Sequence, residues 1–429
     1  MSTNAPCILI YNPISGHGHL DSWNALFVSC LLESDWHVLA LTPDAADLRE
    51  RLEDKGLAKS PGLTILDWDV LRRSFLEKVI GRLKRLFTKR SLPNPSDPEI
   101  NYLSPLEFAL RIKKSLNRTS WKPDLVFNMY MDLYKTDQTS WDAFEAHSKF
   151  PWAGIRFVPK ALPTEAYYRS ASSFGMCFLD EQVSEKYREI LPGKAFSYLP
   201  DITENALPTS PSKLVQQIKN IAAGRKIVFL GGTIGGSKNL YRWYELISRA
   251  DARKWFFLQI GEVHESSLTN DDISARNQIL QNLPENLFIY PEYLQDEKQF
   301  NEIILLSDVL FAVYRDFKIS SNMPGKAAAF NRPILVSDNY LMGARVVKYE
   351  IGCAVPQDDV SQMLLALNTL VQPDRLQSLS HGFEAYRRDF SLEELRVRFD
   401  HFLSQELIRQ GKSFVDIQPH YSKRVERGE

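Results

Sequence analysis

The stretch FLGGTIGGSKNLYRW, residues 229–243, places four glycines in six positions after an apolar run. A lysine, Lys238, follows where the next helix is expected to begin. Backbone N–H groups that no side chain covers can hold a diphosphate, and Lys238 would add a positive charge. We therefore predict a phosphate-binding loop that uses Gly231, Gly232, Thr233 and Lys238. The alternative is a purely structural strand-to-helix turn. A Walker A loop is excluded because Gly-Lys-Ser/Thr is missing.

A second anion site is predicted at a helix start near residue 322. Ser320, Ser321 and Asn322 are typical N-cap residues, and Pro324 suits a first helical turn. The N–H groups of such a helix start favour an anion, and Lys326, one turn further on, would reach a phosphate or a ribose. The alternative is a well-capped core helix with Lys326 exposed.

The segment IYPEYLQDEKQF, residues 289–300, leaves a strand and enters a helix. Its main chain is placed to bind the edge of a base, with Tyr290 at the strand end and Tyr293 lying against the base. This pattern is not specific by itself.

In the first half of the chain, the loop NPISGHGHLDSW, residues 12–23, ends the first strand with glycines and two histidines. Histidine is the side chain best suited to proton transfer near neutral pH. We predict His17, His19 and Asp21 as catalytic residues; the alternative is a turn that carries two solvated imidazoles. The spacing is not Gly-x-Gly-x-x-Gly, so no dinucleotide fingerprint is assigned.

Residues 71–90, LRRSFLEKVIGRLKRLFTKR, repeat apolar residues at helical spacing and carry eight basic side chains against a single acid, Glu77. Such a helix can lie on an anionic lipid surface or hold a phosphorylated substrate. The favoured interpretation is a core-facing amphipathic helix whose solvated face is basic.

The elements that must position these residues alternate between strand and helix. In the first half, strands are predicted at 7–12, 37–42, 63–68, 124–130, 153–158 and 175–180. Helices are predicted at 21–34, with Asp21 or Ser22 as its N-cap, and at 45–56, which Gly56 ends. This alternation indicates a parallel sheet that is covered on both faces. Further polar residues at strand ends are Asn128, Tyr130, Asp132 and Arg156.

The Pro-, Ser- and Thr-rich residues 199–213 read as a linker. A second series follows, with strands at 226–232, 255–261, 287–293, 308–314, 333–338 and 353–356. Helices are predicted near 239–249, 271–282, 297–306, 323–331, 358–371 and 391–410. We predict an α/β protein of two Rossmann-like, doubly wound domains facing a cleft, with ligands at the carboxyl ends of the strands. The predicted boundaries are 1–203, 204–400, and a helix end and tail at 401–429 that packs back on the first domain.

Composition narrows the functional classes. The 429 residues have a formal net charge of -1 at pH 7, so no global field favours nucleic acid. The four cysteines have no paired spacing and are typical of reduced thiols in a cytoplasmic protein. The chain starts without the features of a signal peptide, and no apolar run approaches the roughly 18 residues of a membrane span. We expect a cytoplasmic protein, with contact to the inner face of a membrane as the role that residues 71–90 could add.

Together these motifs resemble the GT-B glycosyltransferases, and among them the retaining nucleotide-sugar group called family four. The element order is similar over nearly the whole chain, whereas the motifs match only in the C-terminal half. The family's glycine loop and lysine resemble GGTIGGSKN, and its base-binding segment resembles YPEYL. Its small-residue helix resembles AAAFNRPILVSD, and its SD-V segment resembles residues 307–309.

Two departures from the family stand in the second half. The family carries two glutamates eight positions apart, and counting back from Pro333 places them at Lys318 and Lys326. The arginine of the family's glycine loop would fall on Gly232 or Thr233. A lysine can bind a hydroxyl or a phosphate but cannot accept from two ribose hydroxyls as a carboxylate does.

The resemblance implies a glycosyltransferase, specifically a hexosyltransferase. It would move a sugar from a nucleoside diphosphate sugar, with UDP or GDP as the nucleotide, to a hydroxyl acceptor. Retention of the anomeric configuration is implied by the family, and no metal or further cofactor is expected. The glycine loop, Tyr290, Tyr293 and the 320–326 segment would bind the sugar donor, and Asn128, Tyr130, Asp132 and Arg156 would lie on the acceptor side. The alternatives are a catalytically degenerate binding or scaffold subunit, and a nucleotide-sugar epimerase.

Overall fold

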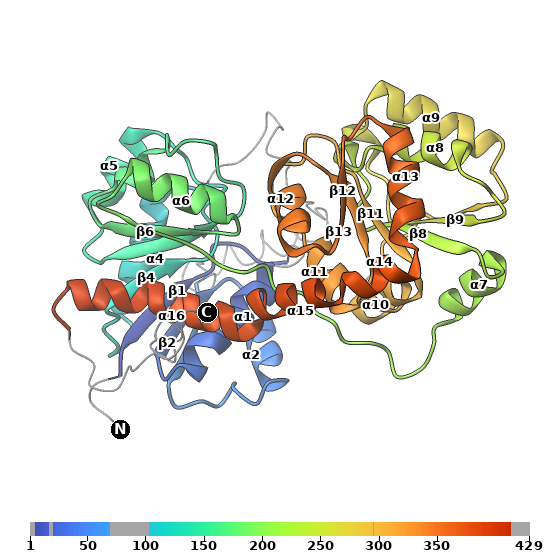
Figure 1. The fold of residues 1–429 in the computed structure, drawn as a ribbon. Helices are drawn as coiled ribbons and strands as arrows, with labels where there is room; N and C mark the ends of the chain where they lie inside the picture. Colours follow the sequence, from blue (N-terminus) through green and yellow to red (C-terminus); the bar gives the residue numbers. More distant parts are fainter. Residues whose placement is uncertain (1–4, 17–19, 69–102, 295, 413–429) are drawn as a thin grey trace, which may run out of the picture. The chain divides into compact units, whose positions relative to one another are not determined.

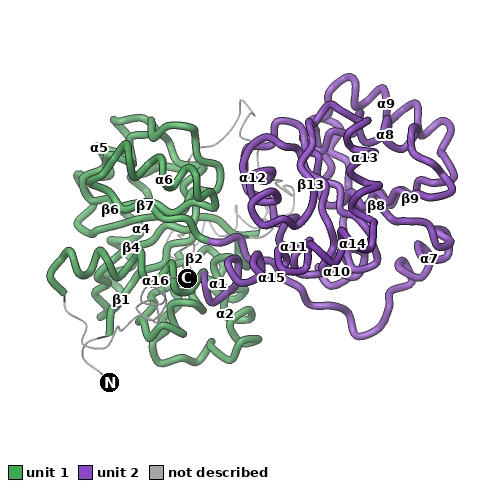
Figure 2. Tube along the Cα trace, viewed as in Figure 1, with its two compact units in different colours: residues 1–199, 395–429 green, residues 200–394 purple. Residues whose placement is uncertain are grey.

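The computed structural model describes residues 5–16, 20–68, 103–294 and 296–412. The chain divides into two compact units (Figure 2). Unit 1 comprises residues 1–199 and 395–429, and unit 2 comprises residues 200–394. Each unit is built on one parallel β-sheet (Figure 1).

The sheet of unit 1 has seven strands in the order β3-β2-β1-β4-β5-β6-β7, all parallel. Its strands are β1 (Cys7–Tyr11), β2 (His37–Thr42), β3 (Leu63–Asp67), β4 (Leu125–Asn128), β5 (Trp152–Arg156), β6 (Ser173–Phe178) and β7 (Ala195–Tyr198). Its helices are α1 (Leu20–Glu33), α2 (Ala45–Glu53), α4 (Pro105–Leu116), α5 (Gln138–Glu145), η1 (Ala166–Arg169), α6 (Glu181–Ile190) and most of α16 (Leu392–Arg409).

Alternation along the strands separates two cores in unit 1. Phe127 of β4 meets Phe27 of α1 and Phe399 of α16, so α1 and α16 cover the same face of the sheet. The neighbouring Val126 lies on the opposite face, in an aromatic cluster with Phe108 of α4. Both faces are therefore buried, which explains why the strands are almost continuously apolar.

Unit 2 has a six-stranded parallel sheet in the order β10-β9-β8-β11-β12-β13. Its strands are β8 (Lys226–Gly231), β9 (Trp255–Ile260), β10 (Leu287–Tyr290), β11 (Val309–Ala312), β12 (Ile334–Ser337) and β13 (Gly352–Val355). Its longer helices are α7 (Lys213–Ala222), α8 (Leu240–Arg249), α9 (Asn270–Gln281), α10 (Glu297–Leu306), α12 (Tyr340–Tyr349), α13 (Val360–Leu370) and α15 (Ser380–Asp389). Shorter ones are η2 (Gly236–Lys238), η3 (Glu265–Ser267), α11 (Met323–Ala329) and α14 (Pro373–Ser378).

The predicted strands and helices are confirmed as elements, with ends that differ by a few residues. The prediction that Asp21 or Ser22 caps the first helix is wrong, because α1 already begins at Leu20 and Asp21 lies in its first turn. Among the helices of the described ranges, none has the length and hydropathy of a membrane span. The basic stretch 71–90 lies outside the described residues.

Candidate functional site

The order of strands in unit 2 defines where a ligand is expected. β8 is flanked by β9 on one side and by β11 on the other, so the connection after β8, to β9, and the connection after β11, to β12, run in opposite directions. Open parallel sheets bind ligands at this switch point, outside the carboxyl ends of the strands. Two loops meet there: the glycine loop (residues 231–239) after β8, and the β11 loop (residues 313–322) after β11.

The glycines of the first loop serve two purposes. Gly232 has φ 88°, which favours glycine, and open space lies where a Cβ would project. At Gly236 a Cβ would come within 2.2 Å of the Ser267 carbonyl oxygen, so this glycine allows the loop to pack against η3. Gly232 is therefore the glycine that leaves room for a ligand, whereas Gly231 packs against the Phe229 ring and Gly235 and Gly236 pack against Ser267.

The backbone of the glycine loop is only partly used by the protein. The N–H groups of Gly232, Ile234 and Gly236 donate to Ile260, Glu262 and Ser267. Between them, the N–H groups of Thr233 and Gly235 have no hydrogen-bond acceptor among the described residues. Alternate amides are thus available to an anion, and Thr233 is exposed.

Lys238 is held at the junction of the two loops. Its Nζ donates to the Gly231 carbonyl oxygen (3.1 Å) and to the Tyr314 hydroxyl (2.6 Å). The ammonium also lies 4.1 Å from the centroid of the Tyr314 ring, a cation–π contact with a side chain that is 2% exposed. Because a lysine has three N–H donors, one remains for a ligand beside Gly232.

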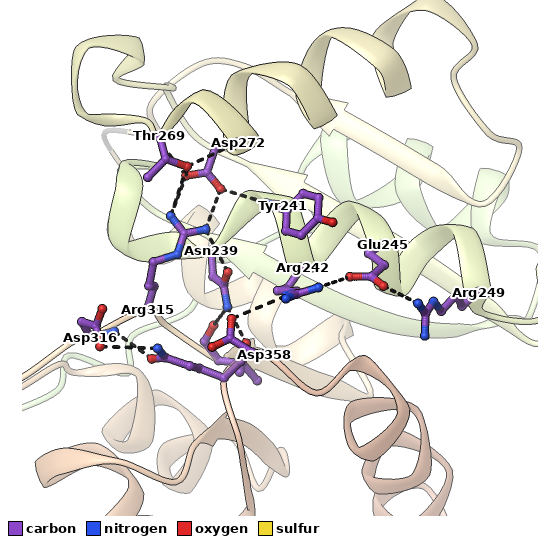
Figure 3. A network of polar contacts seen from close by, with 12 residues as sticks. Asn239, Tyr241, Arg242, Glu245, Arg249, Thr269, Asp272, Arg315, Asp316 and Asp358 are labelled. Carbon is purple, nitrogen blue, oxygen red and sulfur yellow. Dashed lines mark hydrogen bonds and ion pairs between the residues drawn. The ribbon is translucent and has the colours of Figure 1, made fainter.

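A polar network fixes the end of the glycine loop (Figure 3). Arg315, in the β11 loop, donates to both carboxylate oxygens of Asp272 on α9 (2.9 Å each) and to Asn239 Oδ1 (3.1 Å). Asp272 in turn accepts from the backbone N–H of Tyr241 in the first turn of α8 (2.9 Å). Burial alone raises the pKa of Asp272, but hydrogen bonds from Arg315, Thr269 and Tyr241 lower it below its ordinary value.

The predicted base-side tyrosines lie at the end of β10. Tyr290 donates its hydroxyl to Glu292 (3.0 Å), and Tyr293 is 52% exposed. No described contact joins them to the glycine loop, so their part in base binding stays a prediction.

At the second predicted anion site, the start of α11, the polar side chains are bound by other groups of the protein. Ser321 Oγ accepts from Met323 N (3.3 Å), Ser320 bonds Asp201 (3.1 Å), and Asn322 is the N-cap without a capping side-chain bond. Lys326 is 0% exposed; its ammonium binds the Glu204 carbonyl (2.7 Å), the Asn301 amide oxygen (2.5 Å) and the Glu297 carboxylate. Burial lowers the pKa of Lys326, and Glu297 offsets this only in part. The side chain expected at the sugar donor thus ties α11 to α10 and the linker.

In unit 1, the loop after β1 carries the predicted catalytic residues. Asp21 accepts from the Gly16 backbone N–H (2.7 Å), and burial raises the pKa of its carboxyl. This contact closes the loop onto the first turn of α1. His17 and His19 lie outside the described residues.

The predicted acceptor-side residues are held by neighbours within unit 1. Asn128 is fully buried; it donates to the Tyr134 hydroxyl (3.1 Å) and accepts from Tyr130 N (3.0 Å). Asp132 accepts from the N–H groups of Phe157 (3.0 Å) and Val158 (2.7 Å). Arg156 pairs with the buried Glu165 (2.6 Å). Of these four, Tyr130 and Asp132 are partly exposed, whereas Asn128 and Arg156 are buried.

Solved structures resemble the whole chain. The UDP-forming α,α-trehalose-phosphate synthase of Burkholderia vietnamiensis has a TM-score of 0.62 at 12% identity, covering 94% of this chain and 96% of that one. Sucrose-phosphate synthase of Thermosynechococcus elongatus has a TM-score of 0.60 at 14% identity, covering 95% and 100%. A glycosyltransferase of Rickettsia africae has a TM-score of 0.61 at 10% identity, covering 94% and 99%.

The chain has the GT-B fold. No protein-family model and no curated protein sequence matches the chain. At these identities the likeness shows the fold alone.

Two polar residues of unit 2, Arg315 and Asp272, were not among the site residues predicted from the sequence. Arg315 is the third residue after the buried strand β11, in a loop that corresponds to the one carrying Lys238 after β8, and this placement was a usable signal. Asp272 stands three residues after Thr269 and forms a capping box with it, which made it look like an ordinary helix start. Their bidentate pairing across 43 residues carried no sequence signal.

Proposed function

We propose that the chain transfers a sugar from a nucleoside diphosphate sugar to a hydroxyl acceptor, with the diphosphate on the glycine loop. The observation that carries this proposal is the placement of Lys238, whose third N–H is available beside Gly232 at the switch point of a GT-B unit. The unpaired amides of Thr233 and Gly235 supply the neutral donors of the same site.

The chemistry follows from where charge develops. As the bond between the anomeric carbon and the phosphate oxygen breaks, negative charge grows on the departing diphosphate. Lys238 and the two amides are preorganised donors for this charge, and donors of this kind usually make the largest single contribution to catalysis. The start of α8 contributes less, because Asp272 already occupies the N–H of Tyr241. The reaction then needs no resident metal.

The remaining details of the proposal rest on the resemblance to the family-four enzymes. They are a hexose as the transferred group, retention at the anomeric carbon, and UDP or GDP as the nucleotide. The loop after the first strand, read from its residues, adds His17 or His19 to position the acceptor or the sugar of the donor. A protein with this fold is described as bound with UDP-2-fluoro glucose, and a second one as UDP-forming, which supports a uridine nucleotide as the first to test.

The first experiment measures UDP and GDP binding to the full chain by titration calorimetry. Lys238→Ala removes a charged hydrogen bond, which contributes about 1.5–3 kcal/mol. We therefore expect the affinity to fall by about 10- to 100-fold. Lys226→Ala is the matched control, because Lys226 lies at the opposite, amino-terminal end of the same strand, β8, where it pairs with Asp308. Equal affinity of the parent and Lys238→Ala would remove Lys238 from the site.

A turnover assay separates the transferase from its alternatives. Lysines at 318 and 326, in place of the family's acidic pair, favour the alternative of a binding or scaffold subunit. We expect slow release of UDP from UDP-glucose, or of GDP from GDP-mannose, that Lys238→Ala suppresses. Nucleotide binding without turnover across donors and acceptors would favour the binding subunit, and interconversion of the sugar with the nucleotide retained would indicate an epimerase.

A further inference from the structure

The residues on both sides of Lys238 are clamped by a single arginine. Arg315 N donates to the Ser237 carbonyl oxygen (2.8 Å), and the Arg315 guanidinium donates to Asn239 Oδ1. Asn239 is fully buried and adopts the left-handed conformation (φ 57°, ψ 48°). Because its side chain does not cap α8, it is free to bind the β11 loop and the Gln357 carbonyl oxygen (2.8 Å). The backbone of Lys238 is thus fixed from both neighbours.

The guanidinium has no Nη–H left for a ligand in this arrangement. Nη1 faces Asp272 and Thr269 (2.9 and 3.3 Å), and Nη2 faces Asp272 and Asn239 (2.9 and 3.1 Å). These four acceptors match the four Nη–H groups of an arginine. The planar fork explains why arginine suits this position and lysine does not.

Asp272 completes the clamp. Its side chain is 0% exposed, and its charge is balanced by Arg315 in a bidentate pair. The same carboxylate accepts the Tyr241 N–H, so it joins the start of α8 to the β11 loop (Figure 3). The pair therefore links three segments at the switch point: the end of the glycine loop, the β11 loop and the first turn of α9.

We propose that Arg315 and Asp272 are positioning residues that hold Lys238 for the diphosphate without touching it. This inference rests on the proposed function, because it assigns Lys238 to the nucleotide. Tyr314, which precedes Arg315, positions the side chain of Lys238: its hydroxyl accepts a hydrogen bond from the ammonium, and its ring makes a cation–π contact with it. The β11 loop thus sets both the backbone and the side chain of Lys238.

The test is a double-mutant cycle on UDP affinity with the full chain. Arg315→Met is expected to weaken UDP binding by about tenfold, the scale of one charged hydrogen bond. In a Lys238→Ala background the same change is expected to add less than about twofold, because a residue that acts through Lys238 has nothing left to position. Uridine, which lacks phosphates, is expected to bind both proteins equally.

Controls separate positioning from loss of structure. Arg249→Met removes an arginine at the exposed end of the same network, where it pairs with Glu245, and is expected to leave UDP affinity unchanged. Arg315→Lys keeps the charge but not the fork, and is expected to behave like Arg315→Met. If Arg315→Met does not fold by near-ultraviolet circular dichroism, Asp272→Asn carries the cycle instead.

The possible results distinguish the proposed nucleotide site at Lys238 from the positioning role of Arg315. No UDP binding by the parent, or binding that Lys238→Ala leaves intact, overturns the proposed function and this inference together. Binding that depends on Lys238 but not on Arg315 overturns the inference alone. Additive losses also overturn it, since they would mean that Arg315 contacts the nucleotide directly.

Discussion

At the scale of single residues, three cations of unit 2 show how surroundings decide what a side chain can do. Arg315 has its Nη–H groups bound by protein acceptors, and Lys326 is fully buried with three acceptors. Lys238 is partly exposed and has two acceptors for three N–H groups. A cation serves a ligand only with the capacity that the protein leaves unused. This accounting selects Lys238 over the other two.

The Arg315–Asp272 pair also predicts how stability depends on pH. Burial raises the pKa of Asp272, but the hydrogen bonds outweigh it, so the folded pKa lies below the ordinary value for an aspartate. The folded state therefore binds the proton less tightly than the unfolded chain does. The stabilisation is complete well above the unfolded pKa, at about pH 5 and higher, and is lost as the pH falls through the folded pKa.

We expect Asp272→Asn to lower the free energy of unfolding at pH 7, with a difference that narrows steadily as the pH falls from 5 to 3. Urea unfolding at four pH values measures this difference. Asp271→Asn, at the exposed neighbouring position, is the control and should show no such trend. A difference that stays constant with pH would mean that the carboxylate charge contributes nothing.

At the scale of elements, the linker and α11 form one packed assembly. Asn301 of α10 donates to the carbonyl oxygens of Glu204 (3.2 Å) and Ala206 (2.9 Å), and the Lys326 ammonium lies among the same groups. A Cβ at Gly325 would come within 2.0 Å of Thr203 Oγ1, so the linker runs directly against α11. The predicted linker is therefore irregular in structure but fixed by contacts.

Lys326→Met tests this role against the sequence-based one. The change leaves the Glu204 carbonyl oxygen and the Asn301 amide oxygen without their donor, which costs about 1–3 kcal/mol for each group, so we expect a clear loss of stability in urea. UDP affinity, measured where the variant is still folded, should change by less than about twofold. Lys298→Met, at an exposed position of α10, is the control for stability. A loss of UDP affinity as large as that of Lys238→Ala would return Lys326 to the nucleotide site.

The elements themselves were largely predictable, because strands buried on both faces are continuous apolar runs such as KIVFLG in β8. Some of the elements not predicted are short or polar: β7 has four residues, and α6 reads EQVSEKYREI. The amphipathic helices α4 and α12 were not predicted either. The glycine loop was predictable from composition and from its place after a strand. The Arg315–Asp272 contact was not, because register and strand order, which no local pattern encodes, bring these residues together.

At the scale of the whole molecule, the end of the described chain belongs to unit 1. Trp36 Nε1 donates to Asp400 of α16 (2.7 Å), and Phe402 packs against Phe174 of β6 (5.5 Å between centroids). Lys412 pairs with Asp124, which also accepts from Cys7 N at the start of β1 (2.8 Å). Unit 1 is thus completed by α16, most of which follows unit 2 in the sequence.

This division of the chain predicts that stability and nucleotide binding can be separated. Phe399 is 0% exposed and lies 4.7 Å from Phe27 and 4.8 Å from Phe127, between ring centroids. Phe399→Ala leaves a cavity in unit 1, and such changes cost about 3–5 kcal/mol. We expect urea unfolding of unit 1 to begin at a lower concentration, whereas UDP affinity stays as in the parent, because Lys238, Tyr314 and Arg315 all belong to unit 2.

The matched control is Ile408→Ala on the same helix, where the side chain is 70% exposed and little loss of stability is expected. Titration calorimetry with UDP, run in buffer without urea, measures the second half of the prediction. If Phe399→Ala stays folded yet loses UDP affinity, nucleotide binding depends on unit 1 as well, and the assignment of the diphosphate to the glycine loop alone is wrong. If stability is unchanged, α16 contributes no packing energy to unit 1, in conflict with the burial of Phe399, Phe402 and Leu403.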